Sequence, residues 1–278
     1  MPGTGCLPDG VSMRSSDIAY ALRLDPGEQQ RYRMMAAAAR QAEAVEWAHA
    51  GIGPGASVAD VGCGPGALLR LLADEVGEAG RAVGVDGAAD AVEAAVAEVG
   101  HLPQASVRLG DAAATGAPTG AFDVVMCRHV LAHNGGREAE IVGHLAELTR
   151  PGGTVYLVDV DHSMLWMSPS DPDLDDLHGR YVEYQTGRGN DLQVGRSLGP
   201  LLEGAGLAVE VFRVTGPIIR APAGVRSPGW AARGELMAAG LATDADVARW
   251  DAAFRRMDAL AQRPWGAMPI VLAVGRKS

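Results

Sequence analysis

The chain has 278 residues, of which 47% are hydrophobic, and its 34 Asp and Glu against 24 Lys and Arg give a formal net charge of −10. This length suits one large α/β domain with additions, or two small domains, and the apolar fraction is sufficient for a core. The acidic balance argues against nucleic acid as a partner, because no surplus of positive charge is available to neutralise phosphates.

Cysteine usage and hydropathy indicate the compartment. The three cysteines, Cys6, Cys63 and Cys127, are few and odd in number, which is typical of a reducing compartment rather than of a disulfide framework. The first residues lack a basic segment followed by an apolar one, and no apolar run reaches membrane-spanning length. We therefore expect a soluble cytoplasmic protein with no membrane partner.

The first 50 residues carry no strand pattern. Residues 1–14 are rich in Gly, Pro and Ser and are expected to be a disordered tail. Residues 15–50 are expected to form a helical arm, whose longer helix runs from about Glu28 to His49. Because the arm precedes the first strand, we expect it to lie across the sheet edge or the mouth of a site.

From residue 51 onward, apolar runs of strand length alternate with helical patterns. The predicted strands are 57–61, 81–86, 106–111, 122–127, 154–159, 207–214 and 268–275. The predicted helices between them are 66–77, 88–98, 137–148 and 194–204. Strands that alternate with helices in this way indicate βαβ units and a parallel sheet with helices on both faces.

Two stretches, 161–190 and 217–266, interrupt this alternation, and the second is predicted to be mostly helical from Trp230 to Gln262. Both are rich in large apolar side chains, among them Trp166. An apolar and aromatic lid suits a medium-sized organic ligand rather than nucleic acid or a charged peptide.

A glycine-rich turn at Val58–Gly66 joins the first predicted strand to its helix. Without a Cβ, its glycines can adopt left-handed backbone angles and let a ligand approach the main chain closely. The N-terminus of the following helix presents unpaired N–H groups to such a ligand. Gly62, Gly64 and Ala67 also satisfy a relaxed dinucleotide fingerprint, so a nicotinamide cofactor and S-adenosylmethionine both fit this turn by itself.

Further landmarks resemble those of class I S-adenosylmethionine-dependent methyltransferases. Asp86 ends the second predicted strand, Gly110–Asp111 ends the third, Phe122–Val125 resembles the fourth motif, and Leu148–Gly153 resembles a proline–diglycine element before the fifth strand. The late apolar strand resembles the antiparallel last strand of that fold. This combination favours a methyltransferase over a dinucleotide enzyme.

The resemblance implies a Rossmann-like α/β fold with a seven-stranded, mostly parallel sheet, an antiparallel last strand and a helical lid. It places the methyltransferase domain at 51–278, with lid insertions at about 161–190 and 217–266.

The resemblance also implies S-adenosylmethionine as the cofactor. It places Asp86 on the ribose hydroxyls and Asp111, with the N–H of Ala112, on the adenine. Asp60 would orient the turn and reach the methionine amino group, often through water. The other implied cofactor-binding positions are Gly62, Cys63, Gly64, Gly87, Cys127, Arg128 and His129. The N-terminal arm adds Tyr20 and Arg31, which in similar small-molecule enzymes lie over the methionine end of the cofactor.

Methyl transfer depends mainly on alignment and on exclusion of water, and a base helps when the acceptor is a hydroxyl or an acidic carbon. His133, past the fourth predicted strand, and His162, after the fifth, are the predicted catalytic bases. His129 and His133 would share one face if their segment is helical. Alternatively, His129 packs against the cofactor or caps a helix. No tight ligand cluster is visible, so no metal is predicted.

The resulting hypothesis is methyl transfer from S-adenosylmethionine to a small organic acceptor, such as a secondary metabolite, by a chain that could form a homodimer. One alternative is a cyclase or pericyclase on the same fold that binds S-adenosylmethionine without methyl transfer. Another is a regulator that binds the cofactor but catalyses nothing.

Overall fold

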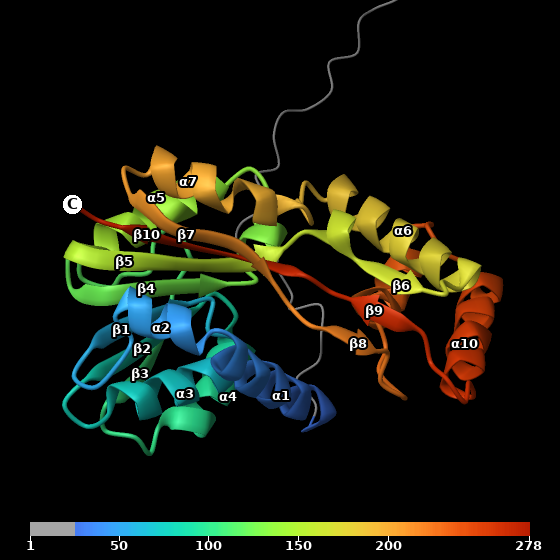
Figure 1. Ribbon diagram of the computed structural model, residues 1–278, viewed down its shortest axis with the longest axis horizontal. Coiled ribbons are helices and arrows are strands. Elements are labelled where there is room, and N and C mark those ends of the chain that lie inside the picture. The colour runs from blue at the N-terminus through green and yellow to red at the C-terminus, as the bar shows by residue number, and fades with distance from the viewer. Residues whose placement is uncertain (1–25) are drawn as a thin grey trace, which may run out of the picture.

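The computed structural model describes residues 26–278, and its centre is a seven-stranded sheet in the order β3-β2-β1-β4-β5-β10-β7 (Figure 1). The strands are β1 (Ser57–Val61), β2 (Arg81–Asp86), β3 (Ala105–Leu109), β4 (Phe122–Arg128), β5 (Thr149–Val160), β7 (Ala208–Thr215) and β10 (Ile270–Arg276). Strands β1 to β5 pair in parallel, and β10 is antiparallel to both β5 and β7. The predicted fold class is confirmed.

Helices cover both faces of this sheet (Figure 1). On one face lie α1 (Pro26–Ala42), α2 (Ala44–Ala50), α3 (Ala67–Val76) and α4 (Ala89–Val99); on the other lie α5 (Glu138–Leu148) and α7 (Leu198–Gly204). Because side chains alternate along a strand, each strand contributes to two cores. In β1, for example, Val58 faces the α2–α3 side, whereas Ala59 faces α5 and α7.

The arm differs from its prediction in two ways. The single helix expected from Glu28 to His49 is two helices, broken at Glu43, and the arm crosses a face of the sheet rather than its edge. Trp47 of α2 is 2% exposed and packs into the core on that face. The tail, residues 1–14, and Tyr20 lie outside the described residues.

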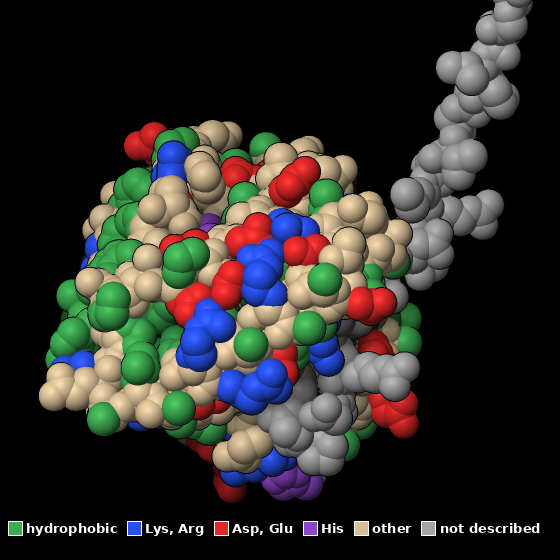
Figure 2. Space-filling model, turned by 90° about the vertical axis from the view of Figure 1, so that its right-hand side faces the viewer, with side chains coloured by type: hydrophobic (Ala, Val, Ile, Leu, Met, Phe, Trp, Pro, Cys, Tyr) green, Lys and Arg blue, Asp and Glu red, His purple; other side chains and the backbone are tan. Residues whose placement is uncertain are grey.

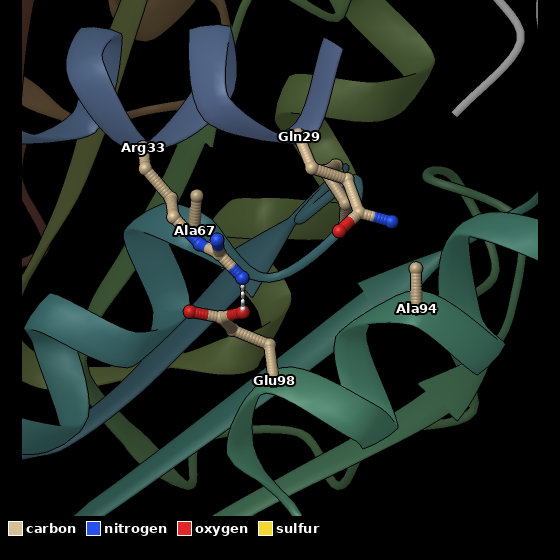
Figure 3. A pocket seen from close by; sticks show the side chains of 6 residues that line it. Gln29, Arg33, Ala67, Ala94 and Glu98 are labelled. Carbon is tan, nitrogen blue, oxygen red and sulfur yellow. Dashed lines mark hydrogen bonds and ion pairs between the residues drawn. The ribbon is translucent and has the colours of Figure 1, made fainter. Parts of the chain in front are cut away.

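Helix α1 is tied to the helices next to the glycine turn. Arg33 of α1 and Glu98 of α4 form an ion pair of 2.7 Å beside a shallow hollow that Pro65 and Ala67 of the turn also line (Figure 3). Arg40 pairs with Glu75 of α3 at 2.6 Å. The arm is therefore held close to the turn that begins α3.

A smaller unit lies beyond the carboxyl ends of the parallel strands (Figure 1). It contains a three-stranded sheet in the order β6-β9-β8, made of β6 (Trp166–Ser168), β9 (Trp265–Ala267) and β8 (Ile218–Arg220). Its helices are α6 (Pro172–Gly187), α8 (Pro228–Ala231), α9 (Arg233–Ala238) and α10 (Asp244–Asp258). Helices α8, α9 and α10 confirm the mostly helical stretch predicted from Trp230 to Gln262. The small sheet was not predicted, because strands of three residues carry almost no alternation.

Apolar packing and ion pairs hold this lid together. Leu177 of α6 and Trp250 of α10 belong to a separate buried cluster. On the outer side, Arg and Asp side chains alternate, as Figure 2 shows, and Arg249 of α10 pairs with Asp173 and Asp176 of α6 at 2.7 and 2.8 Å. Within residues 26–278, no helix has the length and apolar character needed to cross a membrane.

One strand boundary also differs. The turn expected at 150–153 is an irregular, exposed part of β5, which begins at Thr149 and shifts register between its pairs with Phe122 and Val124. Gly152 has φ +76 in this segment. The proline–diglycine element thus bends the strand entrance rather than preceding it.

Candidate cofactor and acceptor site

The glycine turn requires its glycines. Gly62 has φ +81, and a Cβ there would lie 2.2 Å from Cγ2 of Val130; Gly66 has φ +83, and its Cβ would lie 2.9 Å from Cα of Ala95. The N–H groups of Gly62 and Cys63 donate to the carbonyl of Val85 at 2.7 and 3.1 Å, which fixes the turn to β2. The main chain therefore forms a close-packed cradle at the carboxyl end of β1.

Asp86 ends β2 beside this cradle and is 8% exposed. One carboxylate oxygen accepts the N–H of Gly64 and the other accepts the N–H of Ala88, both at 2.9 Å. Each oxygen can accept a second hydrogen bond. The carboxylate can therefore shape the turn and still accept two ligand hydroxyls, as the ribose prediction requires.

Asp60 lies beneath the turn on β1 and is 2% exposed. Its Oδ2 atom is buried without a hydrogen-bond partner. Burial, followed by repulsion from Asp86, raises the pKa of Asp60 to about 7, although Arg128 opposes this shift. A buried carboxylate without a partner is costly, so this position favours a cationic ligand group.

Asp111 is placed differently from the expected free acceptor. It follows β3 and forms a two-pronged ion pair with Arg137, with distances of 3.1 and 2.7 Å, and its Oδ1 also accepts the N–H of Ala113. The guanidinium of Arg137 lowers the pKa of Asp111. The adenine role of Asp111 and Ala112 stays a prediction. In that role, Asp111 would share its carboxylate oxygens between Arg137 and the adenine.

The other predicted positions surround the same rim. Gly87 is exposed directly after β2, while Cys63 and Cys127 are buried thiols whose pKa values burial raises. Arg128, at the end of β4, turns its side chain toward the arm and pairs with Glu43. Its main chain remains at the rim, so only a carbonyl role is compatible with the prediction. Arg31 lies on α1 with its guanidinium 4.9 Å from the ring centroid of Tyr32.

His129 and His133 are not on one helical face, contrary to the conditional prediction. His129 has φ +55, and the 3₁₀ helix η2 (Leu131–His133) begins only two residues later. Nδ1 of His129 lies 4.0 Å from Oδ1 of Asp159. Burial, and then the charge of Arg128, lowers the pKa of His129 to about 3, so the ring is neutral at physiological pH.

His162 lies on the 3₁₀ helix η3 (His162–Met164) after β5 and meets the lid helix α6. Its ring stacks on that of His178, with centroids 5.2 Å apart, and lies 6.1 Å from the ring of Tyr181. Nδ1 of His162 is buried without a partner. Burial, followed by the influence of His178 and His133, lowers the pKa of His162 to about 4, so its lone pair is available at neutral pH.

Asp159 and Glu43 were missed from the sequence. Asp159 ends β5, is 1% exposed and accepts the N–H groups of Ala132 and Val160, which holds the start of η2. Its position at the end of an apolar strand was the available signal. The fully buried Glu43 gave no such signal, because its contacts are with distant segments. His178 was expected in the lid insertion, but its stacking on His162 was not.

The residues fit a cofactor with a cationic amino acid end and a ribose. The unpartnered Oδ2 of Asp60 matches an ammonium, the cradle admits main-chain contact, and Asp86 has acceptor capacity left. Among the described residues, no group of three or more His, Cys, Asp or Glu has an arrangement that could hold a metal ion.

Comparison with known proteins agrees with this geometry. Residues 58–153 match the family model of a methyltransferase domain. The chain is 42% identical over 106 residues to nocamycin O-methyltransferase of Saccharothrix syringae, covering 37% of this chain and 38% of that protein. It is 34% identical over 122 residues to 2-phytyl-1,4-naphtoquinone methyltransferase of Thermosynechococcus vestitus, covering 43% and 52%.

The solved structure of geranyl diphosphate methyltransferase in complex with S-adenosylmethionine superposes with a TM-score of 0.52 at 17% identity, covering 91% of this chain and 92% of that one. At this identity the likeness concerns the fold. The matched segments span only 38% to 52% of the nocamycin and naphtoquinone enzymes. Residues 58–153 therefore match a methyltransferase domain, and the chain has the Rossmann-like fold of the solved methyltransferase structure.

Proposed function

We propose that this protein transfers a methyl group from S-adenosylmethionine to a small organic acceptor. The observation that carries the proposal is the buried, unpartnered carboxylate oxygen of Asp60 beneath a glycine cradle, with Asp86 beside it. The relatives named above that act on nocamycin and on a naphtoquinone support an acceptor of natural-product type.

In this proposal the chain's residues bind and align the reactants. When bound, S-adenosylmethionine supplies an activated methyl group. Asp60 accepts the ammonium, Asp86 the ribose hydroxyls, and Asp111 with Ala112 the adenine. The main chain of Gly62, Gly64, Cys127 and Arg128 lines the methionine part. Tyr20, Arg31, Cys63, Gly87 and His129 complete the proposed cofactor site.

The acceptor would lie toward the lid, where His133 and His162 follow β4 and β5. Both rings have pKa values lowered by burial, so both are neutral at physiological pH and can take a proton from a hydroxyl or an acidic carbon. The unpartnered Nδ1 of His162 makes it the better placed base of the two. Residues 161–190 and 217–266, as the lid, would exclude water from the transfer.

The experiment is an incubation of the full chain with S-adenosylmethionine and a panel of phenolic, enolic and quinol acceptors, followed by mass spectrometry. Formation of S-adenosylhomocysteine together with a product heavier by one methylene supports the proposal. A product of unchanged mass would instead identify a cyclase. Cofactor binding without turnover on any acceptor would identify a regulator.

We further propose that the protein works in the cytoplasm, as a monomer or homodimer, with a small molecule rather than nucleic acid as its partner. The acidic net charge of −10 supports the absence of a nucleic-acid partner, because no surplus of positive charge is available to neutralise phosphates. Retention on a heparin column at physiological salt would argue against it.

A further inference from the structure

A buried polar network connects the N-terminal arm to the rim of the proposed cofactor site. Glu43, at the break between α1 and α2, is 0% exposed. Its two carboxylate oxygens accept hydrogen bonds from Nη1 of Arg128 at 2.7 and 2.9 Å, and one of them also accepts the hydroxyl of Tyr156 at 3.0 Å. A buried carboxylate needs such partners, so the arm, β4 and β5 are joined at this point.

The strand register places Arg128 next to Asp60. Asp60 of β1 pairs with Met126 of β4, and paired residues on neighbouring strands face the same side of a sheet. Arg128 follows two positions later, so it lies on that same face as the diagonal neighbour of Asp60. Two buried carboxylates, Glu43 from the arm and Asp60 from β1, therefore lie near one guanidinium.

The guanidinium is engaged by only one of them. Arg128 donates to Glu43, whereas Oδ2 of Asp60 has no partner. Of the two carboxylates, Glu43 offers Arg128 the better hydrogen-bond geometry, since it accepts two bonds from the guanidinium. Tyr156 completes the hydrogen bonding of Glu43. The oxygen of Asp60 is thereby left for a ligand cation.

We propose that Glu43 is a positioning residue of the cofactor site, which holds Arg128 away from Asp60 so that the Asp60 carboxylate stays available for the ammonium of the cofactor. This inference rests on the proposed function. Without the charge of Glu43, Arg128 turns to Asp60, its diagonal neighbour on that face, and competes with the cofactor. The arm then controls cofactor affinity although Glu43 touches no part of the cofactor.

The ionisable neighbours of Asp60 define the pH behaviour. They are Asp86 from β2, Cys63 from the turn, and Cys127 and Arg128 from β4. Both thiols are neutral, because burial raises their pKa values. Arg128 is therefore the neighbour whose contact with Asp60 a substitution at Glu43 changes.

The test compares full-length wild-type protein with Glu43→Gln, Tyr156→Phe and the double variant Glu43→Gln/Arg128→Met. S-adenosylmethionine binding is measured by calorimetry from about pH 5.5 to 8, a window that spans the Asp60 transition, and thermal melting monitors folding. Glu43→Gln is nearly isosteric. Tyr156→Phe removes one hydrogen bond but keeps the ion pair, so it is the matched control.

We expect Glu43→Gln to weaken binding at least about tenfold at pH 8 and to lose the pH dependence, because Arg128 then keeps Asp60 ionised. Tyr156→Phe should bind within about threefold of wild type. The double variant should regain most of the affinity, since its competing cation is gone and the replaced ion pair leaves no buried charge.

Wild-type affinity and pH dependence in Glu43→Gln would overturn the inference. So would weak binding that the double variant does not restore, because that result indicates a purely structural role. If Glu43→Gln does not fold, the double variant decides alone: affinity near wild type supports the inference, and a loss of tenfold or more overturns it. A wild-type protein that binds no S-adenosylmethionine would instead refute the proposed function.

Discussion

Replacing Asp60 by Asn removes the carboxylate on which the proposed ammonium site depends. Burial raises the pKa of Asp60 from 3.8 to about 7 in the protein without ligand. This group therefore favours the folded state most below pH 3.8, and that contribution is lost as the pH rises to about 7. A bound ammonium favours the ionised carboxylate, so cofactor binding offsets the free energy that burial of the Asp60 charge costs.

The magnitude follows from this shift. Below the pKa of Asp60, each pH unit should weaken cofactor binding about tenfold, or about 1.4 kcal/mol, because the carboxyl must release a proton when the ammonium binds. Going from about pH 8 to about pH 5 should therefore cost up to about 100-fold in affinity. The Asp60→Asn variant should bind more weakly at pH 8 and lose this dependence.

Titration calorimetry with S-adenosylmethionine across this range provides the measurement. Asp159 needs a control, because burial raises its pKa to about 6, inside the same window. An Asp159→Asn variant should keep the Asp60 slope. The rings of His129 and His162 have pKa values of about 3 and about 4 and do not titrate there. A wild-type affinity independent of pH, or an equal slope in Asp60→Asn, would refute the reasoning.

Three further predictions concern the cradle, the ribose acid and the base. Gly62→Ala should destabilise the protein by about 1–3 kcal/mol in thermal or urea unfolding, because its Cβ would meet Val130 at 2.2 Å. Gly53→Ala is the control and should change stability far less, because nothing lies within 4 Å of a Cβ there. Equal melting temperatures of the two variants would contradict this prediction. Asp86→Ala should weaken S-adenosylmethionine binding by about 1.5–3 kcal/mol, and unchanged affinity would remove Asp86 from the site. His162→Ala should lower kcat about 100-fold or more with little change in cofactor affinity. At saturating S-adenosylmethionine, the wild-type kcat should fall only as the pH approaches about 4; an unchanged kcat in His162→Ala would exclude His162 as the base.

The central sheet was predictable because its signals are local. Predicted strands 57–61 and 81–86 coincide with β1 and β2, since apolar runs bounded by glycine turns carry their own boundaries. The break at Glu43 was not predictable, because residues on both sides of it have helical patterns. The contact made there by Glu43 is with Arg128, which is 85 positions away in sequence.

In the site, too, features with a local sequence signal were predictable and features that depend on distant contacts were not. Gly62, Asp60 and Asp86 could be placed from strand ends, because the carboxyl ends of parallel strands meet at one edge of the sheet. The pairing of Asp111 with Arg137 and the stacking of His162 on His178 could not be foreseen. Both contacts join segments that are far apart in sequence and meet only in the folded chain. The strands of the lid were missed because three residues carry almost no alternation.

The most direct test of the central claim is calorimetric titration of the full chain at about pH 8, well above the Asp60 transition, with S-adenosylmethionine and, separately, with NAD. The account predicts saturable binding of S-adenosylmethionine that Asp86→Ala weakens, and no saturable heat with NAD. Binding of NAD alone, or S-adenosylmethionine affinity equal in wild type and Asp86→Ala, would contradict it.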